Sequence, residues 1–374
     1  MDVEELLGRL VAWPTVSDRP VTGIAADLAN RLEAVGMRVE TLAATEPGKC
    51  NLVCSAGPSG TDGIVLSGHM DVVPVEGQPW TSDPFQLTRR DDRLVGRGAC
   101  DMKAFLAAIV AALTRTPPRD LRRELVLIFT HDEEVGCLGS RGIAERYAAE
   151  GRTLPSMALI GEPTSFQMLR MHPGHVAARI TCAGRAAHSS KPDLGANAIR
   201  LAARVIDALD ALAERWRHDV RFPELLERPF VVMNVATIHG GNAVNIVPDR
   251  CIIDVGFRPL PGMSPEGLFE ELRAVVEPLG SVRAELVRVT PAMLTPAGTP
   301  LETLLRPWAA SPDTAAAAFA TDGGNFERMG VRTIVFGPGS IDVAHKADEY
   351  VPIGELHRAV DVVEEVVARR CRLD

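Results

Sequence analysis

The sequence Ser67-Gly-His69-Met-Asp71 follows the apolar run Ile64-Val-Leu66, and the fold of the chain is built around this point. The apolar run predicts a short buried strand that ends at Gly68. Side chains two positions apart in an extended backbone point to the same face, so we expect His69 and Asp71 to be neighbours. A carboxylate beside an imidazole is the arrangement that orients a metal-bound histidine. The stretch therefore predicts a metal ligand at the end of a strand.

A second acid, Asp101, stands just before residues 104–113, which form a strongly helix-favouring stretch. We expect Asp101 to be a carboxylate at a helix N-terminus, held by the capping amides and free to turn its oxygens outward. A histidine and an acid at a strand end, together with an acid at a helix start, are typical of half of a two-metal site. We therefore predict that Asp101 lies close to His69.

The length and charge of the chain indicate its number of domains and the kinds of partner it can bind. Its 374 residues exceed one typical core, so two domains are expected. The net charge is −9, and no block of Lys and Arg occurs, which argues against nucleic acid as a partner. No apolar run reaches membrane-spanning length, and the acidic start at residues 1–5 lacks the features of a secretion signal. We expect no membrane partner.

The cysteines point to a reducing compartment. They are odd in number, scattered, and contain no Cys-x-x-Cys motif; their positions are 50, 54, 100, 137, 182, 251 and 371. This pattern suits the cytoplasm rather than a disulfide framework. We therefore predict a cytoplasmic protein.

Strands alternate with helices in residues 1–175, which predicts an α/β sheet covered by helices on both faces. From residue 176 the order changes to β-α-β-β-α-β, the pattern of a ferredoxin-like module. We assign these six elements to residues 176–182, 196–216, 230–238, 251–257, 265–279 and 282–289. The predicted organisation is a first catalytic part (1–175), an inserted ferredoxin-like domain (176–290) and a second catalytic part (291–374).

Four predicted strands carry metal-type ligands just past their carboxyl ends. The ligands are His69 with Asp71, the pair Glu133-Glu134, then Glu162, and finally His345. Open α/β sheets bind ligands in the crevice beyond these strand ends, so the four groups should converge. Each group alone also has a plain structural interpretation, such as a turn acid, a helix cap or a solvated loop.

The predicted mixture of ligands suits divalent metals. Two neutral imidazoles and several carboxylates favour Zn²⁺, with Co²⁺ or Mn²⁺ as alternatives. A carboxylate can bridge two ions about 3.5–4 Å apart, and a water between them has a pKa near 7. A further carboxylate held off the metals can take a proton from that water as general base. Glu133 and Glu134 are adjacent at a strand end, so one side chain can turn toward a metal and the other toward the water as general base.

The motifs resemble the M20 metallopeptidase and amidohydrolase family over nearly the whole chain. They are Gly68-His-Met-Asp71, Gly98-Ala-Cys-Asp101-Met-Lys103, Asp132-Glu-Glu134 and Gly161-Glu-Pro-Thr164. The resemblance implies a zinc-peptidase-like catalytic α/β domain with a mixed sheet covered by helices, and an inserted ferredoxin-like lid domain that usually dimerises. It also implies two metal ions, with His69 and Glu162 on one, Glu134 and His345 on the other, and Asp101 as the bridge. Asp71 would then orient His69, and Glu133 would be the general base.

The inserted domain gains roles from the same resemblance. His188, in residues 184–190, is similar to the family histidine that reaches the active site of a partner subunit and stabilises the tetrahedral intermediate. Asn242, Asn245 and Arg258 resemble residues that contact the substrate carboxylate, a task that suits the bidentate fork of arginine. Without the resemblance, these four residues are a loop histidine and ordinary turn or strand residues.

Residues 337–350 are most similar to the acetylornithine deacetylase branch of the family. This implies hydrolysis of an N-acyl amino acid, with N2-acetyl-L-ornithine as substrate and a place in arginine biosynthesis. We expect Asp322 to face the side-chain ammonium of ornithine; its alternative is a helix-capping or turn aspartate.

Other activities stay open. A succinyl-diaminopimelate desuccinylase, an aminoacylase and a dipeptidase would use the same chemistry on another substrate. A non-enzymatic metal-binding scaffold is disfavoured because no ligand and no base is missing. A serine hydrolase or a dinucleotide enzyme is disfavoured because the chain contains no Gly-x-Ser-x-Gly elbow and no Gly-x-Gly-x-x-Gly motif after a strand.

Overall fold

The computed structural model describes residues 2–372, which form two compact units, each with its own hydrophobic core. Unit 1 consists of Met1–Arg170, Leu294–Ala315 and Thr321–Asp374, and unit 2 of Met171–Met293 and Ala316–Ala320. Residues 1, 373 and 374, at the ends of the predicted catalytic parts, lie outside the described residues. The assignment of catalysis and dimerisation to separate parts of the chain stays a prediction.

The larger sheet explains why ligands from distant segments meet. Within residues 2–372 it has nine strands in the order β1-β2-β6-β3-β7-β15-β8-β13, with β14 beside β8. Four neighbouring strands at its centre are parallel, namely β6 (Leu125–Thr130), β3 (Ile64–His69), β7 (Met157–Ile160) and β15 (Arg332–Val335). The flanking strands β1 (Arg38–Ala43), β2 (Cys50–Ala56) and β8 (Leu169–His172) pair antiparallel; β13 is Met293–Leu294 and β14 is Ala315–Ala316. The predicted mixed sheet is confirmed.

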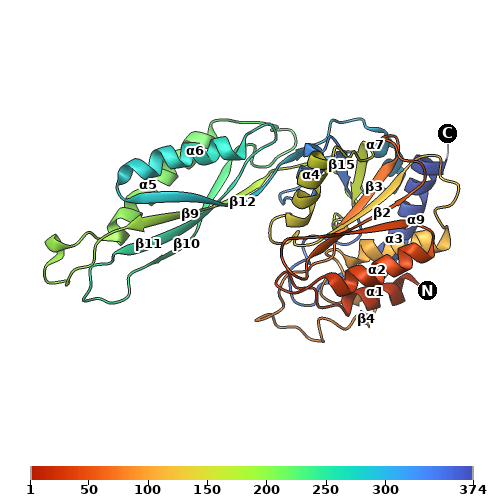
Figure 1. The fold of residues 1–374 in the computed structure, drawn as a ribbon, viewed down its shortest axis with the longest axis horizontal. Coiled ribbons are helices and arrows are strands. Elements are labelled where there is room, and N and C mark those ends of the chain that lie inside the picture. The colour runs from red at the N-terminus through yellow and green to blue at the C-terminus, as the bar shows by residue number, and fades with distance from the viewer. Residues whose placement is uncertain (1, 373–374) are drawn as a thin grey trace. The chain divides into compact units, whose positions relative to one another are not determined.

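Helices cover both faces of this sheet (Figure 1). On one face lie α1 (Val3–Val11), α2 (Thr22–Ala34), α3 (Lys103–Arg115) and α9 (Ile353–Val367), and on the other lies α4 (Leu138–Glu150), against which α8 (Gly323–Arg328) packs. Helix α3 packs against α1, α9 and β3 and is buried on almost every side, as expected for a helix that is apolar all round. No helix between residues 2 and 372 is long and apolar enough to cross a membrane.

Unit 2 has the predicted ferredoxin-like order. Its elements are β9 (His175–Ala183), α5 (Ala198–Arg217), β10 (Val232–Gly240), β11 (Arg250–Arg258), α6 (Pro265–Val276) and β12 (Val282–Thr290). The strands form an antiparallel sheet in the order β10-β11-β9-β12, and both helices pack on one of its faces (Figure 1). Helix α5 begins at Ala198 because the Asn197 side chain accepts hydrogen bonds from the amides of Ile199 and Arg200. This confirms the predicted fold class.

A small antiparallel sheet was not predicted. It joins β4 (Thr88–Arg90) and β5 (Arg93–Val95) to β16 (Tyr350–Pro352). Its strands are too short for a periodic apolar pattern to identify them. The pairing of β5 with β16 brings residue 349 next to the segment that carries Asp101.

Candidate metal centre

The carboxyl ends of the four parallel strands bring the predicted ligands together in unit 1. His69 is the last residue of β3, Glu133 and Glu134 follow β6, and Glu162 follows β7. The Nε2 atom of His69 lies 3.0 Å from Oδ1 of Asp101 and 3.9 Å from Oε2 of Glu162. Gly161 precedes Glu162 because a Cβ atom at this position would lie 1.8 Å from the ring of Phe105.

The second histidine, His345, contacts the other carboxylate oxygen of Asp101. The Nε2 atom of His345 lies 3.3 Å from Oδ2 of Asp101 and 3.0 Å from Oε2 of Glu134. His69 is buried, whereas the side chain of His345 is 48% exposed. Asp101 thus has one imidazole on each carboxylate oxygen, and the Nε2 atom of each imidazole has a second carboxylate within 4 Å, that of Glu162 for His69 and that of Glu134 for His345.

The donor atoms fit divalent metal ions. The ligand atoms of His69, Asp101 and Glu134 lie within 4.8 Å of one another, as do those of His69, Glu133 and Glu162. Imidazole nitrogen and carboxylate oxygen are the donors that zinc and related ions take in proteins. The acids of this cluster outnumber its histidines, so the cluster is short of positive charge.

The pKa values of the cluster reflect this shortage. Burial, with the charge of Asp101, raises the pKa of Glu134 to about 7 and that of Glu162 well above its usual value. Hydrogen bonds to Asp101 and Glu134 raise the pKa of His345 to about 10. Burial opposes ionisation of Asp101, but the two histidines hold its pKa below the usual value. Bound cations would relieve the repulsion among these acids.

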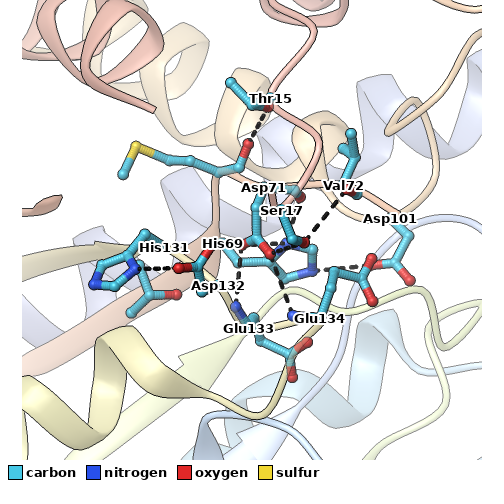
Figure 2. Close-up of polar contacts among 12 residues, drawn as sticks. Thr15, Ser17, His69, Asp71, Val72, Asp101, His131, Asp132, Glu133 and Glu134 are labelled. Atoms are coloured by element: carbon cyan, nitrogen blue, oxygen red, sulfur yellow. Dashed lines mark hydrogen bonds and ion pairs between the residues drawn. The ribbon is translucent and has the colours of Figure 1, made fainter. Parts of the chain in front are cut away.

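Asp71 is a neighbour of His69, as predicted, but its carboxylate has a further task. The Nδ1 atom of His69 lies 2.8 Å from the main-chain oxygen of Asp71 and 3.7 Å from its Oδ1. The Asp71 carboxylate accepts hydrogen bonds from the hydroxyl of Ser17 and from the amides of Glu133 and Glu134 (Figure 2). The carbonyl therefore holds the imidazole, and the carboxylate holds the turn that carries the two glutamates.

The predicted capping role of Asp101 is wrong. Helix α3 begins at Lys103, and its N-cap residue, Met102, makes no side-chain capping bond. The Lys103 amide donates to the carbonyl of Gly98 instead. The Asp101 carboxylate contacts the two histidines, and its own amide donates to Oε1 of Glu349. Asp101 is thus oriented by its partners outside the helix.

A buried network behind the glutamates was missed by the sequence interpretation. The Nζ atom of Lys49 lies 2.6 Å from Oδ1 of Asp132, and Nδ1 of His131 lies 3.1 Å from Oδ2 of the same residue. Asp132 has a φ of +52°, in the left-handed region, at the start of the turn. The one available signal was a lysine standing directly before the apolar strand β2. Its buried partner, Asp132, is 83 positions away.

Asp322 lies beside the predicted general base. The ligand atoms of Glu133, Cys137 and Asp322 lie within 4.8 Å of one another. The Asp322 carboxylate accepts hydrogen bonds of 2.7 Å from Thr130 and 2.6 Å from Ser140. It makes no side-chain capping bond to α8, so the helix-capping alternative is wrong. Its role toward a substrate amine stays a prediction.

The predicted site residues of the inserted domain all belong to unit 2, whereas the cluster of acids and histidines belongs to unit 1. His188 is exposed, and its Nδ1 atom lies 2.7 Å from the hydroxyl of Ser190. Asn242 and Asn245 are exposed in the segment between β10 and β11, and Arg258 is the half-buried last residue of β11. The functions of these four residues stay predictions.

An α/β sheet with histidines and carboxylates gathered at its carboxyl edge is the arrangement of a metal-binding enzyme. The chain belongs to peptidase family M20/M25/M40, which matches residues 65–369. It is a metal-dependent amidohydrolase of this family.

Two relatives that match nearly the full length of the chain are named acetylornithine deacetylase. The chain is similar to the acetylornithine deacetylase of Myxococcus xanthus, at 36% identity over 98% of this chain and 96% of the relative. It is similar to the acetylornithine deacetylase of Proteus mirabilis at 33% identity, with the same shares of both chains covered.

Solved structures show the same fold. The M20 metallo-carboxypeptidase of Sulfolobus solfataricus matches with a TM-score of 0.80, at 19% identity, over 98% of this chain and 99% of that one. A dinuclear metal-binding M20 peptidase of Bacillus subtilis matches with a TM-score of 0.68, at 15% identity, over 98% and 97% of the two chains.

Proposed function

We propose that the protein hydrolyses N2-acetyl-L-ornithine to L-ornithine and acetate, a step of arginine biosynthesis. The observation that carries the hydrolytic chemistry is the Asp101 carboxylate with His69 on one oxygen and His345 on the other. The choice of substrate is supported by 36% identity to an acetylornithine deacetylase over nearly the full length of both chains. N-succinyl-diaminopimelate, other N-acyl amino acids and dipeptides are the competing substrates.

Two divalent ions, in our proposal zinc, complete the site. His69 and Glu162 hold one ion, Glu134 and His345 hold the other, and Asp101 is shared. Cobalt is the alternative metal, because the ligands are nitrogen and oxygen atoms. When bound, the ions polarise the acyl carbonyl and lower the pKa of water.

Glu133 is the proton carrier of the proposed reaction. Burial raises the pKa of its carboxyl group well above the usual value, and the negative charges of Asp322, Glu134 and Asp101 raise it further. A raised pKa suits a group that must both accept and return a proton near neutral pH. Glu133 takes the proton from the attacking water and then delivers it to the leaving α-amine. We assign to His188 the support of the oxyanion that forms at the acyl carbon.

Arg258 supports the binding of a substrate carboxylate. Among the described residues, no hydrogen bond or ion pair to its guanidinium is found, and burial together with the charge of Arg288 lowers its pKa. Arg258 lines a cavity of about 380 Å³ in unit 2, whose other lining residues are apolar except for Glu227 and Arg228, which pair with each other. A half-buried cation without an anion favours a ligand that brings one. We assign Asn242 and Asn245 to the same carboxylate and Asp322 to the ornithine ammonium.

We also propose a homodimer formed through unit 2 and a location in the cytoplasm. Strand β10 is an edge strand of its sheet, and most of its residues are exposed. Exposed apolar side chains lie on and just after it, with Val244 fully exposed and Ile238 and Ile246 about half exposed. All seven cysteines are buried and unpaired, as in a reducing compartment. Light scattering coupled to size-exclusion chromatography tests the dimer, and a monomer at micromolar concentration would contradict it.

A substrate panel tests the function. Metal-stripped protein is reloaded with Zn²⁺ or Co²⁺ and assayed with N2-acetyl-L-ornithine, N-acetyl-L-leucine, N-succinyl-L,L-diaminopimelate and a dipeptide. We expect the highest kcat/KM with N2-acetyl-L-ornithine and no turnover before metal is added. A higher kcat/KM with the succinyl compound or the dipeptide would overturn the proposed substrate.

The matched control is the Glu133→Ala variant purified in parallel. Expression hosts contain deacetylases of their own, and this variant measures their contribution because it lacks the proposed base. If the wild-type and variant preparations turn over substrate at the same rate, the activity comes from host enzymes. That result would contradict the proposed activity of the protein.

A further inference from the structure

Arg97 and Glu349 form a buried ion pair that the reaction described above does not use. Both side chains are 1% exposed, and Nη1 of Arg97 lies 2.5 Å from Oε2 of Glu349. Burying charges is costly unless partners satisfy them, and both terminal nitrogens of the Arg97 guanidinium have partners, although its buried Nε atom has none among the described residues. The remaining contacts of this pair lead to two of the proposed metal ligands.

Glu349 holds the segment that ends in Asp101. Its Oε1 atom accepts hydrogen bonds from the amides of Cys100, at 2.9 Å, and Asp101, at 3.0 Å. The main-chain oxygen of Glu349 also accepts a hydrogen bond from the amide of Gly96. One side chain therefore fixes the backbone from which the shared carboxylate projects.

Arg97 connects this segment to the one that carries His345. Its Nη2 atom donates to Oε1 of Gln78, at 2.6 Å, and to the carbonyl of Pro74, at 3.3 Å. Gln78 in turn donates from Nε2 to the main-chain oxygen of His345 at 2.9 Å. Arg97 Nη1 lies 3.4 Å from the carbonyl of Lys346, the next residue. The guanidinium thus joins three segments that lack regular secondary structure.

We propose that Arg97, Glu349 and Gln78 are positioning residues that fix Asp101 and His345 relative to each other for metal binding. The planar fork of Arg97 is required, because its two arms serve Glu349 on one side and Gln78 with Pro74 on the other. The inference rests on the proposed two-metal site, but not on the identity of the substrate.

Each substitution has its own expected pattern. Groups behind the ligands typically change metal affinity about 10–100-fold when they are removed. Gln78→Leu should weaken only the ion held by Glu134 and His345, since Gln78 contacts the backbone of His345. Glu349→Leu, which removes the acceptor of both amides, and Arg97→Lys should weaken the binding of both ions, since both ions share Asp101. A purely structural defect would not separate the two binding steps.

The test is isothermal titration of Co²⁺ into metal-free protein, with the visible absorption of bound cobalt as a second readout. The variant His345→Ala identifies the step that belongs to Glu134 and His345. The double variant Arg97→Met/Glu349→Leu leaves no unpaired buried charge, so it should be more stable to heat than Glu349→Leu alone, while its metal affinity stays low. Arg31→Met is the control, because its ion pair with Asp27 lies within α2; it should bind cobalt like the wild type.

Two results would overturn the proposal. One is a folded double variant that binds both cobalt ions with wild-type affinity and spectrum. The other, which stays available if the double variant does not fold, is a folded Gln78→Leu protein in which the His345 step is unchanged. Because no substrate is involved, failure of the proposed deacetylase activity leaves this test intact.

Discussion

The main-chain amide of Glu133 donates a hydrogen bond of 3.1 Å to the Oδ1 atom of Asp71, 62 positions earlier in the chain. The next amide, that of Glu134, lies 3.3 Å from Oδ2 of the same carboxylate. One aspartate thereby fixes a turn whose adjacent side chains have different partners. Glu134 contacts His345, whereas Glu133 lies beside Cys137 and Asp322. Asp71 thus fixes the positions of the proposed ligand Glu134 and the proposed base Glu133 relative to each other.

Asp71→Asn should therefore impair the site without unfolding the protein. An amide side chain offers one acceptor oxygen, so one of the two amides of the turn must lose its partner. We expect kcat or metal affinity to fall about 10–100-fold, the usual cost of losing a group behind a metal ligand. Steady-state kinetics and cobalt titration measure this loss. Ser17→Ala removes a single hydroxyl from Asp71 and should cost less; equal losses would contradict the argument.

Glu133→Ala should abolish turnover while metal binding survives. General acid–base groups typically contribute about 10²–10⁴-fold to the rate. In our proposal Glu133 acts twice, first as the base that takes a proton from water and then as the acid that gives it to the leaving amine. The five proposed ligands, His69, Asp101, Glu134, Glu162 and His345, are unchanged in this variant. The measurement is kcat in the metal-loaded variant together with its cobalt stoichiometry. Near-normal turnover would exclude Glu133 as the base.

The convergence of the ligands was predictable from the sequence because it depends on one topological fact. Parallel neighbouring strands end at the same edge of a sheet, so ligands that follow β3, β6, β7 and β15 must meet. Apolar runs identify such buried strands without knowledge of their partners. The ferredoxin-like order of unit 2 was predictable for a similar reason, because each of its elements has a clear period.

The residues that support the ligands could not be found in this way. Arg97 and Glu349 are 252 positions apart, and each looks like an ordinary charged residue in the sequence. Helix α4 was also missed, since only Gly139, Ser140, Ile143 and Tyr147 of its residues are buried. The expected capping of α3 by Asp101 failed because local helix rules do not include its two histidine partners. Long-range polar contacts leave no period in a sequence.

Metal binding should release protons near neutral pH. In the metal-free protein the pKa of His345 is raised to about 10 by its hydrogen bonds to Asp101 and Glu134, so this imidazole is charged at pH 7. Burial raises the pKa of Glu134 to about 7, so this group is partly protonated there. Both must lose their protons to bind an ion, so the apparent affinity should rise as the pH rises from 6 toward 10.

Calorimetric titration of Zn²⁺ in two buffers of different ionisation enthalpy measures the number of protons released. We expect more than one proton per protein at pH 7 and fewer in the His345→Ala variant. The same shifts act on the stability of the metal-free protein. Because both folded pKa values lie above their unfolded values, the contribution to stability is complete at low pH and is lost as the pH rises through about 7 and then about 10. A pH-independent affinity would contradict these assignments.

Asp322→Ala tests whether the substrate amine is recognised next to the base. If Asp322 pairs with the ornithine ammonium, its removal should lower kcat/KM more for N2-acetyl-L-ornithine than for neutral N-acetyl-L-leucine. A role confined to supporting Glu133 would lower both to the same extent, because both reactions need the same proton transfers. The hydrogen bonds from Thr130 and Ser140 make Ser140→Ala a useful companion, since it loosens Asp322 but keeps its charge. A selective loss in Asp322→Ala, with a smaller and unselective loss in Ser140→Ala, would assign the charge of Asp322 to substrate recognition, whereas equal losses on both substrates would remove it from the binding site.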